Sequence, residues 1–442
     1  MKITSDSQKL MLFFGKHNCL PHIKQTASTN ILFKKLFNEI DAAVKYIETV
    51  KFQMGDTFYK LKIQKINSVN QIPKPTTFPV DGFPHIIRKH IDEYSFASLT
   101  YTFHLFGRPI TIIFLIEDDK PELYIEKYNT YVDHMLTWLY IVNEYASRSC
   151  AANLTVFVYH TSLTKELPKS SIEILNEHHV NTAFTMSCPK NSEIVVFRKE
   201  EWFKVFMHET FHNFALDFSD MNTSASHSKI LSIFPVNSDV NLFEAYTEFW
   251  ARIMNVLFCS YFNTKATKNK DKDKDKDKAT KNKDKSINDF LKNTEYFMNL
   301  EIMYAFFQMI KVLHFMNLEY RQLYESDIQS DTIRKTLYKE NTNVLSYYVI
   351  TMILIFNYQP FLSWCNTNNT SLLQFKKTTA SQASFCDFIE KKYKNSDLLS
   401  AIDCTVRLFK NVKNSQQQLG STKLKNISYL MNNLRMTICE LG

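Results

Sequence analysis

The apolar positions of this chain follow two different periods, which together predict an α+β fold. Helical periodicity covers residues 36–50 and 121–145. Runs rich in β-branched and aromatic residues predict strands at residues 57–66, 99–116, 154–160, 180–186 and 193–197. The second strand run folds back at Gly107, and the last two runs flank a turn at residues 188–191, which predicts a hairpin.

The last third of the chain shows only helical periodicity. It predicts helices over residues 287–317, 343–358, 385–393, 398–412 and 424–434. We therefore expect a first part that carries the sheet, followed by an all-helical lobe.

One predicted helix carries side chains that a hydrophobic core does not explain. Residues 202–216 are apolar on nearly every side, yet they contain the sequence His208-Glu209-Thr210-Phe211-His212. Positions four apart share a helix face, so the two histidines can direct imidazole nitrogens at one metal ion. Glu209 lies about 100° around the helix, where it can take a proton from a metal-bound water but is badly placed as a third ligand. The pattern predicts one bound Zn²⁺ and hydrolytic chemistry.

Coincidence explains this motif poorly. With 13 His and 45 acidic residues in 442 positions, roughly 0.04 matches to HExxH are expected by chance. Two histidines and a glutamate are also costly to bury in an apolar helix without a partner, and a metal ion supplies that partner.

A catalytic zinc needs a third protein ligand and an open position for water. The HExxHxxGxxH variant is excluded, because Ala215 and Phe218 stand where it has Gly and His. A second apolar helical stretch, residues 241–252, carries Glu244 and Glu248 on one face. One of them could ligate the metal while the other, one turn away, accepts the second ring N–H of a ligating histidine.

Other assignments of these carboxylates stay open on the sequence alone. Glu248 could instead form an i,i+4 ion pair with Arg252, and Glu244 could be a solvated surface carboxylate. The lesser candidates for the third ligand are Asp217, Asp220, His227 and Asp239.

HETFH followed by Glu244-Ala-Tyr-Thr-Glu248 resembles the gluzincins, the thermolysin-like zinc metallopeptidases, whose pattern is HExxH and then ExxxD/E. The resemblance implies that His208, His212 and Glu244 hold the zinc, that Glu209 is the general base and that Glu248 orients a ligand. Position 248 departs from the family, which usually has Asp there.

Two further roles follow from the same resemblance. Residues 181–185 are similar to the edge strand with which zincins bind a peptide as an added antiparallel strand, although a plain hairpin packed on the helix is an equal alternative. Such enzymes also use a Tyr or His to stabilise the oxyanion of amide hydrolysis. The candidates for this donor are Tyr246, His314, Tyr347 and Tyr348, although a core position is the more common explanation for each of them, since the chain has 22 Tyr.

Composition narrows the function classes. The six glycines form neither GxGxxG nor GxxxxGK[ST], which argues against nucleotide-binding loops. Of the formal charge of +8, ten Lys and five Asp in residues 264–286 supply +5. This segment predicts a solvated, disordered insertion, and its aspartates and lack of aromatics argue against nucleic-acid binding.

The expected location is intracellular and cytoplasmic. The eight cysteines are scattered without a CxxC pair and follow no signal peptide, which predicts free thiols in a reducing compartment. The longest apolar stretch, Val349–Phe356, is too short to span a bilayer, so no membrane association is expected. The bias towards Lys, Asn, Ile and Phe, together with residues 200–214, resembles uncharacterised HExxH proteins of large DNA viruses, which implies a host cytoplasm or a virion.

We therefore expect a zinc metalloendopeptidase of the gluzincin type, a viral hydrolase acting on a protein or peptide. The expected fold is α+β, with a zincin-like catalytic domain, a small mixed sheet and a mostly helical C-terminal lobe. The expected divisions are an N-terminal α+β domain (1–120), the catalytic core (121–263), the disordered insertion (264–286) and the helical lobe (287–442).

The alternative is a catalytically inactive zincin-like protein in which any metal is structural and the helical lobe binds a partner. A closed shell of four protein ligands would favour it. A processing protease with one target protein would differ from a general peptidase by a narrow cleft.

Overall fold

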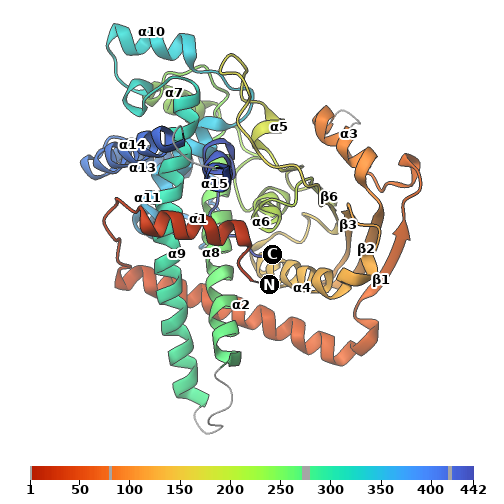
Figure 1. Ribbon diagram of the computed structural model, residues 1–442. Helices are drawn as coiled ribbons and strands as arrows, with labels where there is room; N and C mark the ends of the chain where they lie inside the picture. The colour runs from red at the N-terminus through yellow and green to blue at the C-terminus, as the bar shows by residue number, and fades with distance from the viewer. Residues whose placement is uncertain (1, 79–81, 271–278, 417–420) are drawn as a thin grey trace.

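The computed structural model describes residues 2–78, 82–270, 279–416 and 421–442, and its fold is α+β (Figure 1). One mixed sheet is formed by β1 (Lys60–Lys65), β2 (Ala97–Leu105), β3 (Arg108–Ile116), β4 (Asn153–Tyr159), β5 (Ala183–Thr185) and β6 (Asn191–Val196). Their order across the sheet is β1-β2-β3-β4-β6-β5. The strands β3, β4 and β6 run parallel, whereas β1, β2 and β5 run antiparallel to their neighbours.

Local sequence explains the connections of this sheet. Phe106 and Gly107 both have positive φ (58° and 70°), as a two-residue hairpin turn between β2 and β3 requires. The parallel pair β3 and β4 needs a crossover, which the helix α4 (Ile125–Tyr145) provides. The hairpin predicted near residues 188–191 is confirmed as β5 and β6, but Val180 ends the short helix α5 (Glu177–Val180) instead of starting a strand.

Each face of the sheet packs against helices. One face packs into the main core, a single cluster of contacting side chains that come from positions between Leu10 and Leu441. The other face carries a smaller core covered by α3 (His85–Tyr94), with Ile87 and Ile91 directed at the strands.

The remaining helices lie around α6 (Trp202–Asn213), which is in the middle of the molecule (Figure 1). They are α1 (Ser5–Lys16), α2 (Ala27–Met54), α7 (Ser224–Ile233), α8 (Leu242–Lys270), α9 (Ala279–Phe315), α10 (Ile328–Leu337), α11 (Thr351–Phe356), α12 (Tyr358–Asn368), α13 (Thr379–Lys392), α14 (Ser396–Gln416) and α15 (Ser421–Asn432). A π-helical turn, η6 (Leu345–Ile350), leads directly into α11. The five helical stretches expected after residue 287 are all present.

The expected domain boundary after residue 120 lies inside one continuous sheet. The boundary after residue 120 falls between β3 and β4, which are hydrogen-bonded neighbours, so the first 120 residues supply three strands of the shared sheet. Helix also extends into both ends of the segment 264–286 that we expected to be disordered, because α8 continues to Lys270 and α9 begins at Ala279. Residues 271–278 of that segment lie outside the described residues.

The expectation that all cysteines are free thiols is wrong for four of them. Disulfides join Cys19 to Cys404 and Cys150 to Cys188, over sequence separations of 385 and 38 residues. The free, buried thiols are Cys259, Cys365, Cys386 and Cys439. Cysteines this far apart form no recognisable spacing motif, so the sequence did not predict their pairing. Because disulfides persist in oxidising compartments, the cysteines no longer indicate a reducing one.

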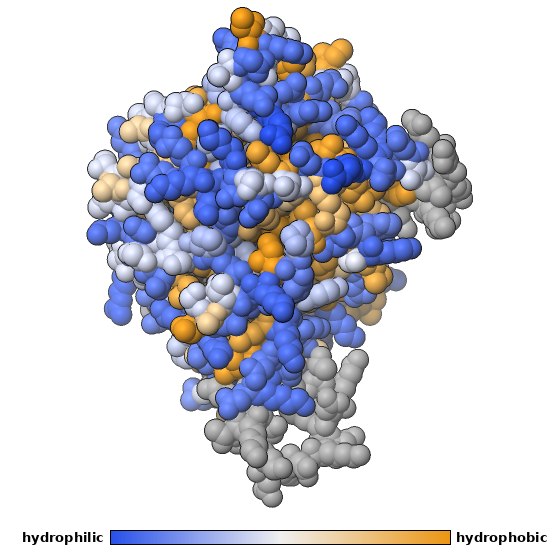
Figure 2. Space-filling model, turned by 90° about the vertical axis from the view of Figure 1, so that its left-hand side faces the viewer, coloured by the Kyte–Doolittle hydropathy of each residue, from blue (hydrophilic) through white to orange (hydrophobic). Residues whose placement is uncertain are grey.

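Within the described residues, no single helix has the length and apolar composition to cross a membrane. The pair Leu345–Phe356 and Tyr358–Asn368 meets that test only when taken together, with a bend of 92° between its parts. On the face shown in Figure 2, hydrophilic side chains predominate and apolar ones lie among them.

Candidate metal centre

The HETFH motif lies on α6, which is buried along its whole length from Trp202 to Asn213. The helix packs against α8, β5 and β6 (Figure 1). The two middle positions of the motif hold it in place: the indole N–H of Trp138 on α4 donates to the Thr210 hydroxyl (2.7 Å), and Phe211 stacks on the same indole. The residues between the histidines therefore fix the helix that carries them.

A left-handed residue ends α6 and turns the chain back along it. Ala215 has a φ of 55°, its N–H donates to the His212 carbonyl (3.0 Å), and the Leu216 N–H donates to the Phe211 carbonyl (2.8 Å). This pair of bonds is the Schellman arrangement that closes helices, usually with Gly at the left-handed position. The turn brings Asp217 back to the last turn of α6.

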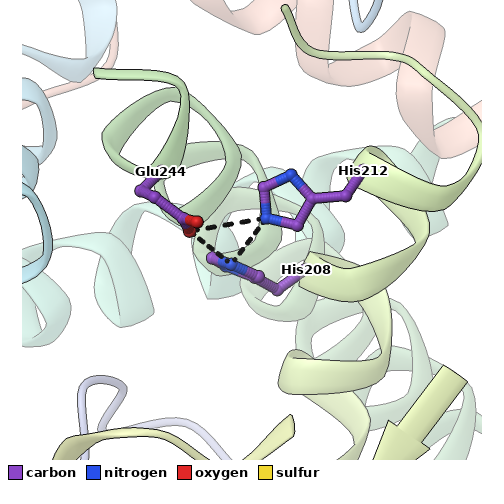
Figure 3. Close-up of side chains that lie close together, drawn as sticks. All are labelled: His208, His212 and Glu244. Atoms are coloured by element: carbon purple, nitrogen blue, oxygen red, sulfur yellow. Dashed lines mark hydrogen bonds and ion pairs between the residues drawn. The ribbon is translucent and has the colours of Figure 1, made fainter. Parts of the chain in front are cut away.

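Three mostly buried side chains converge: His208 and His212 from α6 and Glu244 from the first turn of α8 (Figure 3). The His208 Nε2 atom lies 3.2 Å from His212 Nε2 and 3.1 Å from Glu244 Oε2. His212 Nε2 lies 3.4 Å from the same carboxylate oxygen. The sequence prediction that α8 supplies the third member of this group through Glu244 matches this arrangement.

These spacings fit a small tetrahedral metal ion. Zinc binds imidazole nitrogen and carboxylate oxygen at about 2.0–2.2 Å, so the ligand atoms around it are separated by about 3.3–3.6 Å. The three separations between 3.1 and 3.4 Å lie close to that range. Zinc in catalytic sites also accepts this donor set of two imidazole nitrogens and one carboxylate oxygen.

The other ring nitrogen of each histidine meets a carboxylate. His208 Nδ1–H donates to Glu248 Oε2 (3.1 Å), and His212 Nδ1–H donates to Asp217 Oδ2 (2.6 Å). These contacts leave Nε2 of both rings available for a metal and fix the orientation of the rings. Glu248 therefore has the contact that the sequence indicated.

The alternative partner for Glu248 is excluded, since Arg252 pairs with Glu301 (2.8 Å). Lys204 is the cation that pairs with Glu248, at 2.9 and 3.0 Å from its two oxygens. Lys204 lies one helical turn before His208, so its position on the same face of α6 was a signal in the sequence that our reading missed.

Asp217 was considered only as a lesser candidate for the third ligand. The structure gives it a different role, because it contacts the nitrogen of His212 that faces away from Glu244. Its second oxygen accepts a hydrogen bond from the Ser219 hydroxyl (3.0 Å). The other lesser candidates, Asp220, His227 and Asp239, do not belong to the group formed by His208, His212 and Glu244.

Burial and charge act against each other in this cluster. Burial lowers the pKa of His212, but Glu244 and Asp217 outweigh it and hold that pKa well above its ordinary value. Burial raises the pKa of Glu244, yet the two imidazoles outweigh it, so that pKa lies well below the ordinary range. Glu244 is therefore a carboxylate anion whose charge faces two rings, which suits a ligand of a divalent cation.

Glu209 has a different environment from Glu244. It lines a pocket together with His208, Glu248 and Tyr347. Burial raises its pKa above the ordinary value for Glu, and the two histidines only partly oppose that effect. A carboxyl group whose pKa is moved towards neutrality is suited to accept and release a proton.

Tyr347 stands out among the four candidates for an oxyanion donor. Its hydroxyl donates to Glu244 Oε2 (2.9 Å), and its ring lies 5.9 Å from the His208 ring. It lies in the π-helical turn η6, a local widening that is frequent at functional sites. The hydroxyls of Tyr348 and Tyr246 donate instead to the main-chain carbonyls of Leu434 and Leu373.

His314 is also excluded as the oxyanion donor, because it contacts Phe409 and Lys413 on the helical lobe.

Comparison with known proteins found no match: no family model, no curated protein and no solved structure matched this chain. The geometry of the cluster is therefore what supports a function for this protein.

We expect Asp217→Asn to weaken zinc binding by about 10–100-fold, the effect typical of removing a carboxylate behind a ligating histidine. The amide cannot balance the charge that develops on the ring when it binds a cation. A competition titration with a chromogenic chelator measures the affinity. Asp220→Asn is the matched control, since Asp220 pairs with Lys377 at an exposed position (2.7 Å) and should leave the affinity unchanged.

Proposed function

We propose that this protein is a zinc-dependent peptidase of the gluzincin type with a zincin-like catalytic domain. The observation that carries the proposal is the triangle of His208, His212 and Glu244 beside the buried carboxyl of Glu209. A metal ligand set and a general base are the two parts that hydrolysis of an amide by water requires.

In this proposal one Zn²⁺ would be held by His208, His212 and Glu244. Glu248 and Asp217 would orient the two histidine rings. A bound zinc supplies Lewis-acid chemistry, which polarises a carbonyl and makes water acidic near neutral pH. The chain itself supplies the geometry, because its two carboxylates hold the imidazole rings in one tautomer.

Glu209 would move the proton. Its carboxylate takes one proton from the attacking water and delivers it to the nitrogen of the leaving amine, which leaves Glu209 ready for another cycle. Because burial raises its pKa, the group holds a proton more readily during the reaction than an exposed glutamate would.

The strand β5 would bind the substrate backbone. It is the edge of the sheet, and the Phe197 N–H donates to the Thr182 carbonyl (2.8 Å) just before it. Hydrogen-bonded and non-bonded pairs alternate in an antiparallel ladder, so the main-chain groups of Ala183 face away from β6. That open side also borders the pocket of Glu209, which suits the addition of an extended peptide.

Tyr347 would stabilise the oxyanion by donating its hydroxyl proton in a hydrogen bond. We expect Tyr347→Phe to lower kcat by about 10²–10³-fold, the cost of one oxyanion donor, with little change in KM or zinc content. Steady-state kinetics on a fluorogenic peptide measure this. Tyr348→Phe is the control, since that hydroxyl donates to a main-chain carbonyl (2.6 Å); equal losses in the two variants would contradict the assignment.

The competing function is an inactive protein with a structural metal. A structural zinc site is normally closed by four protein ligands. Among the described residues the cluster has three members, His208, His212 and Glu244, which leaves a position for water. This difference favours the enzyme.

The test is zinc analysis of the purified full chain, combined with incubation of the zinc-loaded protein with a mixed peptide library read by mass spectrometry. We expect one zinc per chain and new peptide termini that disappear when a chelator removes the metal. Stoichiometric zinc without any cleavage would support the inactive alternative with a structural metal, and absence of zinc would reject the peptidase and leave the inactive alternative.

A further inference from the structure

The pocket beside Glu209 contains two buried lysines that the proposed hydrolysis does not use. The pocket is lined by Lys165, Lys204 and Thr182 together with the apolar side chains of Val205 and Met436. Lys165 and Lys204 are only 1% and 3% exposed. Lysine is rarely buried to this extent unless it has a partner, so both residues need an explanation.

Each lysine has one carboxylate partner. Lys204 pairs with Glu248, and Lys165 pairs with Glu201. The two ammonium groups are therefore balanced by two carboxylates, and Glu209 adds one further acidic group to the lining. The pocket carries no excess of positive charge.

Glu201 also builds the far wall of the pocket. Its carboxylate accepts the main-chain N–H groups of Met436 (2.8 Å) and Thr437 (2.6 Å). These bonds hold the C-terminal segment against α6, so that the Met436 side chain lines the pocket. The Lys165–Glu201 pair is thus part of a rigid wall and not a surface ion pair.

The ion pair of Lys165 leaves hydrogen-bond donors unused, and the third donor of Lys204 has only a weak acceptor. An ammonium group has three N–H donors. Lys204 directs its donors at two oxygens of Glu248 and at the Met436 sulfur (4.0 Å), which is a weak acceptor. Lys165 has one carboxylate oxygen as its ion-pair partner, and the buried Thr182 hydroxyl has no partner among the described residues.

An apolar side chain in this pocket would leave those donors without acceptors, which costs free energy because they are shielded from water. A carboxylate would accept their hydrogen bonds, but it would add an unbalanced negative charge close to Glu209 and Glu248. A carboxamide has a carbonyl for the lysines and an NH₂ group for the Thr182 hydroxyl or the Glu248 carboxylate.

We propose that this pocket selects a substrate residue with a carboxamide side chain, Asn or Gln, next to the bond that is cut. The proposal rests on the peptidase function proposed above, and it adds the class of side chain that the enzyme recognises. Lys165, Lys204 and Thr182 are the residues that determine this specificity.

The first test compares peptides that differ at one position, with Asn, Asp or Leu, three side chains of similar size, on either side of the cleaved bond. A site built to hydrogen-bond its substrate rejects an analogue that lacks the polar group strongly. We expect kcat/KM for Asn to exceed that for Leu by about tenfold or more, with Asp also below Asn. Equal or faster cleavage at Leu or Asp would overturn the proposal.

A binding measurement separates this proposal from the function on which it rests. The zinc-loaded Glu209→Gln protein should bind the Asn peptide more tightly than the Leu peptide, as measured by calorimetry without turnover. If this preference is present but the native protein cleaves no peptide, the peptidase function fails and the pocket assignment stands. If peptides are cleaved without preference for Asn, the pocket assignment fails and the peptidase function stands.

The double variant Lys165→Met/Glu201→Gln tests the role of Lys165 in this preference. It removes the ammonium group without leaving a buried charge, and the Gln carbonyl can still accept the N–H groups of Met436 and Thr437. We expect the ratio of Asn to Leu cleavage to fall to near one while zinc content stays the same. An unchanged ratio would overturn the role of Lys165.

Two further variants control this experiment. Lys311→Met removes another buried lysine, which donates to the Asn433 carbonyl (2.6 Å) and does not line the pocket, and it should keep the preference. Thr182→Val removes only the unpartnered hydroxyl and conserves the shape of the side chain. If the double variant does not fold, a reduced preference in Thr182→Val supports the proposal and an unchanged one rejects it.

Discussion

Glu209→Gln is expected to lower kcat by about 10²–10⁴-fold, the usual contribution of a general acid–base group, while zinc remains bound. The amide has almost the same shape as the carboxylate but cannot take the proton from water. Glu209 does not belong to the metal-binding group of His208, His212 and Glu244, so the ligand set is intact in this variant. Zinc content by elemental analysis and steady-state kinetics on one peptide check both parts of the prediction.

The control for this variant is Glu390→Gln on α13, where the carboxylate pairs with Lys229 and is about half exposed (46%). It should retain full activity. Peptidase activity retained in Glu209→Gln would refute the assignment of the base. Loss of zinc from Glu209→Gln would instead mean that this residue holds the metal or its site together.

Glu244→Ala is expected to have the largest effect on metal binding. It removes one of the three proposed ligands and also leaves the His208 and His212 rings without the charge that faces them. Loss of a residue that only orients a ligand lowers metal affinity by about 10–100-fold. We expect Glu244→Ala to lower zinc affinity by more than this, and hydrolysis to fall with it. A chelator competition titration gives the affinity.

His212→Ala should behave in the same way, because it removes another proposed ligand from the same cluster. Since zinc binds only the folded site, added zinc should raise the melting temperature of the native chain but not that of either variant. Native-like zinc affinity in Glu244→Ala would show that another residue completes the ligand set.

Much of the cluster could be predicted because it depends on local periodicity. Residues four apart share a helix face, so the sequence alone indicates that His208 lies beside His212 and that Glu244 lies beside Glu248. The apolar flanks of both segments indicated that these helices are buried, and α6 is buried throughout. Lys204 follows the same rule, one turn before His208, and was overlooked.

The residues that the sequence could not assign come from separate parts of the chain. Four aromatic or imidazole donors were equally good by spacing, and only the packing of η6 against α8 brings the Tyr347 hydroxyl to Glu244. Asp217 reaches His212 because Ala215 adopts a left-handed conformation, which a non-glycine residue rarely signals. The pocket wall at Met436 depends on a contact across more than half of the chain.

The sequence by itself determined the α+β class, most of the strand positions and the helices of the C-terminal lobe, since each depends on a short-range period. It also predicted that His208, His212 and Glu244 lie together, because each belongs to a motif on one helix. Only the tertiary structure decided that strands on both sides of residue 120 share one sheet, that four cysteines pair and that two buried lysines line the same pocket as Glu209. These features depend on contacts between residues far apart in the chain, and the free energy of such contacts is set by burial and partner choice that no local pattern encodes.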